Sequence, residues 1–154
     1  MSLRATDLVF VVEDSDEDVE AIERAISRSH PDVRLEFFRS GGAVLSRLAE
    51  ERELPWLALV DLNMPGESGL DVVRAIRADR ALDALTVVVF TSSEDQGEAD
   101  ACYAAGADSY IYKPINFALF QSVLSQTLDY WRSRPAGNDA RIVVPPPGDS
   151  SAHT

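Results

Sequence analysis

The sequence has very few residues that could form crosslinks or bind soft metal ions. It contains one cysteine, Cys102, and two histidines, His30 and His153. A lone cysteine cannot form an internal disulfide, and this widely spaced set does not resemble a zinc site. The composition therefore excludes a disulfide-stapled fold and a structural zinc site, and it fits a reducing compartment.

Long hydrophobic runs are also missing. Runs such as "WLALV" at 56–60 and "VVVF" at 87–90 are far shorter than the roughly 20 apolar residues that a membrane-spanning helix needs. Residues 1–7 have no signal-peptide pattern. We therefore expect a cytoplasmic protein that makes no membrane contact.

Positive charge is scarce: 14 Lys and Arg residues stand against 26 Asp and Glu residues, for a net charge of −12. Such a chain repels phosphate backbones, and no part of it forms a basic domain, so we expect no binding to nucleic acid. At 154 residues, 45% of them hydrophobic, the chain has the size of one domain with a substantial core. The expected partner is another protein.

Apolar runs rich in β-branched residues alternate with segments of helical spacing. The runs predict five strands, at 7–12, 33–38, 56–60, 86–90 and 109–113. Regular alternation with five helices is typical of an α/β fold in which helices cover both faces of a parallel sheet. The second run alternates charged Arg34 and Glu36 with apolar residues, which predicts an edge strand.

The composition changes after Trp131. We predict one domain over residues 1–131 and a tail over 132–154, which is rich in Pro, Gly and Ser and has one apolar island at 142–144. Disorder is the default for such a tail. Alternatively, the island could reach a neighbouring subunit and, with the unusually apolar last helix at 117–131, form a two-fold homodimer.

Polar side chains follow four of the predicted strands. Glu13 and Asp14 follow the first, Asp61 the third, Thr91 the fourth and Lys113 the fifth. The carboxyl ends of parallel strands meet at one rim, where ligands bind in open α/β sheets. We therefore expect three acids, a hydroxyl and an amine to converge there.

Each of these groups has a role in phosphoryl transfer. Mg²⁺ prefers oxygen ligands, and two or three carboxylates with a backbone carbonyl form a suitable incomplete shell. An ammonium and a hydroxyl can hold the oxygens of an incoming phosphoryl group. Asp61, at the end of a central strand, is the candidate nucleophile because a carboxylate can form an acyl phosphate once its surroundings neutralise the approaching charge.

Each residue also has a simpler interpretation. Residues 16–18 are acids that suit the first turn of a helix and would face solvent. Asp61 could cap a loop, Thr91 could cap the next helix, and Lys113–Pro114 could be an ordinary turn. The coincidence at four strand ends, in order, favours a site.

The motifs "VVED", "VDLNMPGESGLDVV", "VVVFTSS" and "AGADSYIYKPI" resemble the receiver domain of two-component response regulators, at family spacing. The resemblance implies a flavodoxin-like, doubly wound sheet of five parallel strands in the order 2-1-3-4-5, with five helices. It also implies that Asp61 accepts a phosphoryl group from a histidine kinase in a Mg²⁺-dependent reaction. We expect a single-domain regulator that signals through protein contacts.

The resemblance assigns the remaining roles. Asp14 and Glu13 would be the metal acids beside Asp61, with Asn63 giving a backbone-carbonyl ligand. Asp is commoner than Glu at position 13 in the family, and the longer side chain of Glu13 is expected to reach the metal through water. Thr91 and Lys113 would contact the phosphoryl group, and Tyr110 would move with Thr91. The Lys113–Pro114 bond would be cis.

A finer resemblance, in "TSSED", "CYAAGADSYIYKP" and the last helix, is to small stand-alone regulators that partner phytochrome-type histidine kinases. Two alternatives remain. One is a receiver-like scaffold that is not phosphorylated. The other is an aspartyl-phosphate phosphotransferase or phosphatase; these enzymes generally place a second acid two residues after the nucleophile, where this chain has Asn63. We expect a signalling domain with at most slow self-dephosphorylation.

Overall fold

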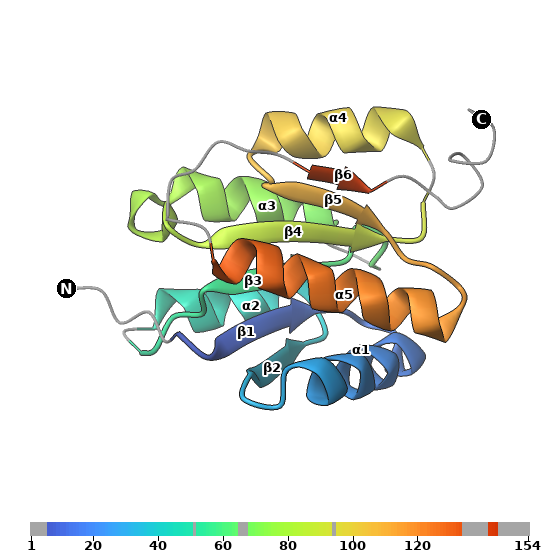
Figure 1. Ribbon diagram of the computed structural model, residues 1–154. Helices are drawn as coiled ribbons and strands as arrows, with labels where there is room; N and C mark the ends of the chain where they lie inside the picture. The colour runs from blue at the N-terminus through green and yellow to red at the C-terminus, as the bar shows by residue number, and fades with distance from the viewer. Residues whose placement is uncertain (1–5, 51, 65–67, 94, 134–141, 145–154) are drawn as a thin grey trace.

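The computed structural model describes residues 6–50, 52–64, 68–93, 95–133 and 142–144. A parallel sheet forms the middle layer, and helices lie on both of its faces (Figure 1). The strands are β1 (Leu8–Val12), β2 (Arg34–Phe38), β3 (Leu57–Val60), β4 (Thr86–Thr91), β5 (Ser109–Tyr112) and β6 (Ile142–Val144). The helices are α1 (Asp16–Ser29), α2 (Gly41–Ala49), α3 (Gly69–Ala78), the 3-10 turn η1 (Arg80–Leu82), α4 (Gln96–Ala105) and α5 (Phe117–Arg132).

The strand order is β2-β1-β3-β4-β5-β6, and each neighbouring pair is parallel. The first five strands confirm the predicted flavodoxin-like order. β2 lies at one edge, as its charged alternation predicted, while every residue of β1 and β3 is buried. Central strands covered on both faces need a continuous apolar sequence, which explains the unbroken runs.

The apolar island of the tail adds a sixth strand to the sheet of its own chain. Ile142 aligns with Ser109 and Val144 with Ile111. This differs from the expectation of a disordered tail or an arm on a neighbour. The physical reason is that β5 would otherwise present a row of unpaired backbone groups, which a short β-prone segment of the same chain satisfies. The other tail residues from 134 onward lie outside the described residues.

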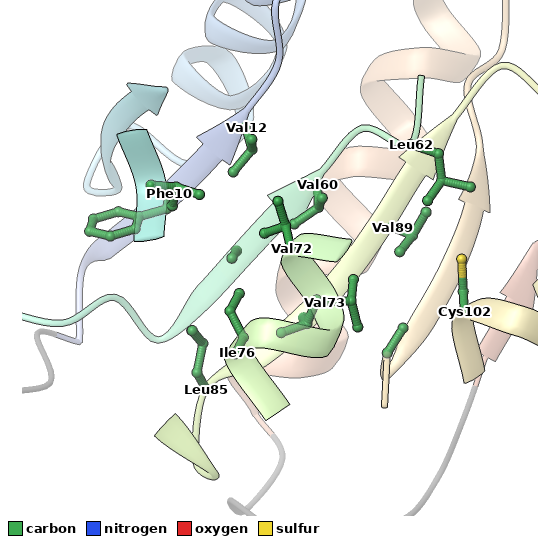
Figure 2. Packing of buried hydrophobic residues seen from close by; sticks show 14 of the residues in the cluster. Phe10, Val12, Val60, Leu62, Val72, Val73, Ile76, Leu85, Val89 and Cys102 are labelled. Carbon is green, nitrogen blue, oxygen red and sulfur yellow. The ribbon is translucent and has the colours of Figure 1, made fainter. Parts of the chain in front are cut away.

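The core has two halves, one on each side of the sheet. Alternate strand residues point to opposite faces, so Phe10 lies in the half of the core covered by α2, α3 and α4, and Val9 in the half covered by α1 and α5. Figure 2 shows the first half, where Val72 of α3 lies beside Val60 of β3 and Val73 and Ile76 follow farther along the helix.

The apolar stripe of α5 is mostly used within the chain. Phe120, Leu124 and Leu128 are buried against the sheet, and Trp131 donates its indole N–H to Ser109 Oγ at 3.0 Å. The richness of this helix in apolar residues is therefore explained largely by its own core. Among the described residues, none of the helices has the length and hydropathy to cross a bilayer.

Candidate functional site

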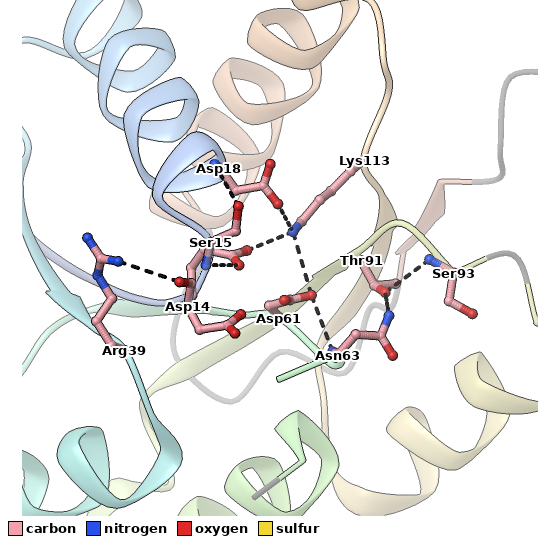
Figure 3. Close-up of polar contacts among 10 residues, drawn as sticks. Asp14, Ser15, Asp18, Arg39, Asp61, Asn63, Thr91, Ser93 and Lys113 are labelled. Atoms are coloured by element: carbon pink, nitrogen blue, oxygen red, sulfur yellow. Dashed lines mark hydrogen bonds and ion pairs between the residues drawn. The ribbon is translucent and has the colours of Figure 1, made fainter. Parts of the chain in front are cut away.

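Every strand end that the sequence singled out opens onto the same rim of the sheet (Figure 3). β1 leads into Glu13 and Asp14, and β3 into Asp61. Thr91 is the last residue of β4, and Lys113 directly follows β5. The convergence arises because these neighbouring strands are parallel and end at one level.

Three carboxylates form a cluster at this rim. One oxygen each from Glu13, Asp14 and Asp61 lies within 4.8 Å of the others. Glu13 is 2% exposed and Asp61 7%, and burial raises the pKa of both carboxyls, although nearby Lys113 opposes the rise. Buried like charges at this spacing repel one another and favour a bound cation. An all-oxygen, partly open donor set suits Mg²⁺ or another hard divalent ion.

Lys113 places a positive charge next to this cluster of acids. Its Nζ lies 2.7 Å from Glu13 Oε2, 2.8 Å from Asp18 Oδ2 and 3.5 Å from Asp61 Oδ1. The Lys113 side chain is 8% exposed; burial alone would lower the pKa of its ammonium, but the hydrogen bonds to Asp18 and Glu13 outweigh burial, and the pKa is raised. Lys113 is also the only lysine in the sequence, a signal that the motif analysis did not use.

Asp18 is a site residue that the sequence analysis missed. Asp16, Glu17 and Asp18 do form the first turn of α1, as predicted, and Ser15 caps the helix. However, Asp18 does not simply face solvent, because its carboxylate pairs with Lys113. Asp18 lies near the rim because it belongs to the first turn of α1, directly after the loop that carries the acids. Its contact with Lys113 depends on the tertiary fold.

Glu13 is held by contacts inside the protein. Its Oε2 accepts from Lys113, and its Oε1 accepts the backbone N–H of Ser15 at 3.1 Å. The longer arm of a glutamate thus spans from the ammonium to the start of α1. Its expected water-mediated contact with a metal stays a prediction.

The loops after β3 and β4 are linked by side-chain hydrogen bonds. The Asn63 amide donates to Thr91 Oγ1 at 3.2 Å, and the same hydroxyl accepts the Ser93 N–H at 3.1 Å. The Asn63 backbone N–H donates to Asp61 Oδ1 at 3.4 Å. Asn63 therefore connects the carboxylate to the hydroxyl expected to contact a phosphoryl group.

Tyr110 reaches the same loop from β5. Its hydroxyl donates to the Ser93 carbonyl at 3.2 Å, and its ring is buried, with burial raising the phenol pKa to about 12. Tyr110 does not bond Thr91 itself; Ser93 links the two residues. Thr91 and Tyr110, which were predicted to move together, are therefore linked through the backbone of Ser93.

Gly69 brings α3 against the carboxyl end of β3. A Cβ built at this position would lie 2.2 Å from the Asp61 carbonyl oxygen, and the Gly69 N–H donates to the Leu62 carbonyl at 3.2 Å. Only a residue without a side chain allows this approach. The glycine therefore fixes the backbone that carries Asp61.

The predicted cis bond between Lys113 and Pro114 is wrong. The backbone has no cis peptide bond among the described residues, so the Lys113–Pro114 bond is trans. Trans is the more stable form of an X–Pro bond by about 0.5–1 kcal/mol, and the contacts of Lys113 form with this geometry.

Arg39 is a further cation near the rim that the sequence analysis did not identify. It pairs with Asp16 and donates to the Asp14 backbone carbonyl at 3.5 Å. Its guanidinium is about half exposed. Arg39 thus connects the end of β2 to the loop that carries the acids.

Comparisons with known proteins give this rim a family context. In sequence, the chain is 32% identical over 128 residues to "Probable methanogenesis regulatory protein FilR2" of Methanothrix harundinacea, covering 80% of this chain and 83% of that protein. In structure, it resembles the phosphorylated cyanobacterial phytochrome response regulator RcpA, with 26% identity, a TM-score of 0.77, and coverage of 87% of this chain and all of that one.

The Mn²⁺-bound response regulator Rcp1, from Synechocystis sp., is similar to the same degree: the TM-score is 0.76 at 25% identity, covering 86% of this chain and 99% of that chain. The sequence profile of the response regulator receiver domain matches residues 9–125, which include every predicted site residue. The chain therefore belongs to the response regulator receiver domain family.

Proposed function

We propose that this protein is a single-domain response regulator that accepts a phosphoryl group on Asp61 from a histidine kinase and signals through protein contacts. The observation that carries the proposal is the arrangement around Asp61. Its carboxylate lies 3.5 Å from the Lys113 ammonium and belongs to a tight cluster with two other acids. That combination provides a nucleophile, a cation-binding edge and a positive charge at one point.

In the proposed reaction, an Asp61 carboxylate oxygen attacks the phosphorus of a kinase phosphohistidine. The new P–O bond forms as the P–N bond breaks, and the electron pair leaves with the imidazole nitrogen. Lys113 and the Thr91 hydroxyl donate to the transferred oxygens. Mg²⁺ would supply further positive charge where the phosphoryl oxygens approach. Its ligands would be Asp14, Asp61 and the Asn63 carbonyl, with Glu13 reaching it through water.

The signal then passes through the loop after β4. To reach a phosphoryl group on Asp61, Thr91 has to give up its hydrogen bonds with Asn63 and Ser93. Because Tyr110 donates to the carbonyl of that same residue, Ser93, movement of this loop frees the phenol to turn inward. Phosphorylation would thereby bias two packings of the α4-β5-α5 surface.

The proposed kinase partner is of the phytochrome type, in the cytoplasm. Support comes from RcpA, which is described as a phytochrome response regulator, and from RPA3017, a 27% identical structure described in red light signaling of R. palustris.

We also propose a homodimer through α5 and the C-terminal tail, in which β6 pairs with β5 of the other subunit instead of its own. A three-residue strand is easily exchanged because the same backbone bonds form in either arrangement. Removing residues 135–154 and measuring the mass by light scattering tests this. A truncated chain that stays dimeric would show that the tail does not form the dimer. A monomeric full-length chain would rule out the dimer itself.

Two other functions fit less well. A phosphotransferase or phosphatase needs a general acid two residues after the nucleophile, and Asn63 instead uses its amide as a donor to Thr91. A scaffold without phosphorylation leaves the buried acids and lysine without a purpose. Incubation with Mg²⁺ and acetyl phosphate, followed by intact mass spectrometry, decides: one added phosphoryl group that Asp61→Asn lacks supports the phosphoacceptor.

A further inference from the structure

The Lys113 ammonium is held away from Asp61 by a residue outside the four strand ends. Its Nζ is 2.8 Å from Asp18 Oδ2, whereas Asp61 Oδ1 is 3.5 Å away. Figure 3 shows the ammonium between Asp18, on the first turn of α1, and Asp61 across the rim. In this unphosphorylated state, the shorter contacts of Lys113 are with Asp18 and Glu13.

The start of α1 explains why the Asp18 carboxylate is available. Residues 15–18 have the pattern of a capping box, in which the acid at the third helical position accepts the N–H of the capping residue. Ser15 Oγ does accept the Asp18 N–H at 3.3 Å, but Glu13 Oε1 takes the Ser15 N–H. Glu13 thus replaces Asp18 in the cap, and Asp18 binds Lys113 instead.

We propose that Asp18 is a positioning residue: it retains Lys113 on the α1 side in the resting protein and competes for it with the phosphoryl group on Asp61. This inference rests on the proposed phosphoacceptor function. Lys113 has to approach Asp61 to contact a transferred phosphoryl group. Asp18 is 37% exposed and Glu13 is 2% exposed, so the solvent-screened Asp18 contact is the one that breaks first.

The chemistry of lysine suits this exchange. An ammonium on a flexible stem can pass from one acid to another, whereas the planar guanidinium of arginine is fixed by paired bonds. The chain uses arginine at its other basic positions and lysine only here. Asp18 would therefore set how readily Lys113 is released to the reacting group.

The resting contact can be observed directly, because a protein labelled with ¹³C at lysine Cε gives one side-chain signal. Asp18→Asn keeps the size of the side chain and should shift this signal and lower the pKa of the ammonium. Glu17→Gln removes a charge from the same helical turn, but Glu17 is exposed and has no polar partner among the described residues. It should leave the signal nearly unchanged.

The functional consequence is tested by the rate of phosphorylation with acetyl phosphate and saturating Mg²⁺. Asp18→Asn should react about threefold faster than wild type, the factor expected for one partly exposed ion pair. Glu17→Gln should react at the wild-type rate. In a Lys113→Met background, adding Asp18→Asn should have no effect, because the two residues act through one interaction.

The outcomes separate this inference from the function on which it rests. A wild type that takes up no phosphate contradicts the proposed function, while the lysine signal still tests the resting contact. A wild type that is phosphorylated, with Asp18→Asn matching Glu17→Gln in both signal and rate, overturns the role of Asp18. If Asp18→Asn does not fold, Asp18→Ser replaces it; failure of both to fold makes Asp18 purely structural and also overturns the inference.

Discussion

Lys113 Nζ and Glu13 Oε2 form a buried ion pair of 2.7 Å, with side chains 8% and 2% exposed. Removing one partner leaves the other charge buried without compensation. We expect Lys113→Met to lower the free energy of unfolding by about 3 kcal/mol in Mg²⁺-free buffer and to impair phosphorylation. Urea unfolding and intact mass measure the two effects, and the exposed Arg52→Met is a control for loss of a surface ion pair.

If Lys113→Met has wild-type stability and phosphorylation, Lys113 is an ordinary loop residue. That result would contradict the proposal that Lys113 balances the charge of the buried acids.

Mg²⁺ should stabilise the protein, because a ligand that binds only the native state raises its melting temperature. Asp14 belongs to the acid cluster, so Asp14→Ala should lose most of the increase. Thermal melts with and without millimolar Mg²⁺ test this, with Asp95→Ala as an acid-to-alanine control away from the cluster. Equal responses of wild type and Asp14→Ala would contradict the metal assignment.

The stability of the metal-free protein should depend on pH through the raised pKa of Asp61. A carboxyl with a raised pKa in the folded state favours folding below its unfolded pKa, and this contribution is lost as the pH rises through the folded value. We therefore expect Asp61→Asn to be more stable than wild type at neutral pH, with the difference vanishing as the pH falls to the ordinary value of 3.8. Unfolding curves across this range measure it; a difference independent of pH would show that ionisation of Asp61 is not the cause.

Gly69→Ala should displace the backbone at Asp61, because the added Cβ would lie 2.2 Å from the Asp61 carbonyl oxygen. We expect a loss of about 1–3 kcal/mol in stability and slower phosphorylation. The control is Gly97→Ala, where the nearest atom, 3.2 Å away, belongs to the Asp95 side chain, which can move. Equal behaviour of the two variants would contradict the positioning role of Gly69.

The sequence was sufficient to predict the sheet and the rim. Continuous apolar runs such as 57–60 imply burial on both faces, and parallel strands bring their carboxyl ends together. This placed Asp61 and Lys113 near each other although 52 positions separate them (113 − 61). Alternation of charge along β2 likewise identified an edge strand.

The missed features depend on tertiary choices that local patterns do not encode. Asp18 has the same local signal as any first-turn acid, and its pairing with Lys113 appears only when the fold brings the start of α1 to the loop that follows β5. The Ile142–Val144 island has β-propensity, but propensity does not choose between its own sheet edge and another chain. The cis Lys113–Pro114 bond is predicted only by family resemblance, and the residue types contain no local determinant of the isomer.

The most direct test of the central claim is the mass of the intact protein after incubation with Mg²⁺ and acetyl phosphate. We expect one added phosphoryl group in the wild type, an adduct that is lost in hydroxylamine because it is an acyl phosphate, and none in Asp61→Asn. An unmodified wild type, or an adduct that persists in Asp61→Asn, would contradict Asp61 as the phosphoacceptor.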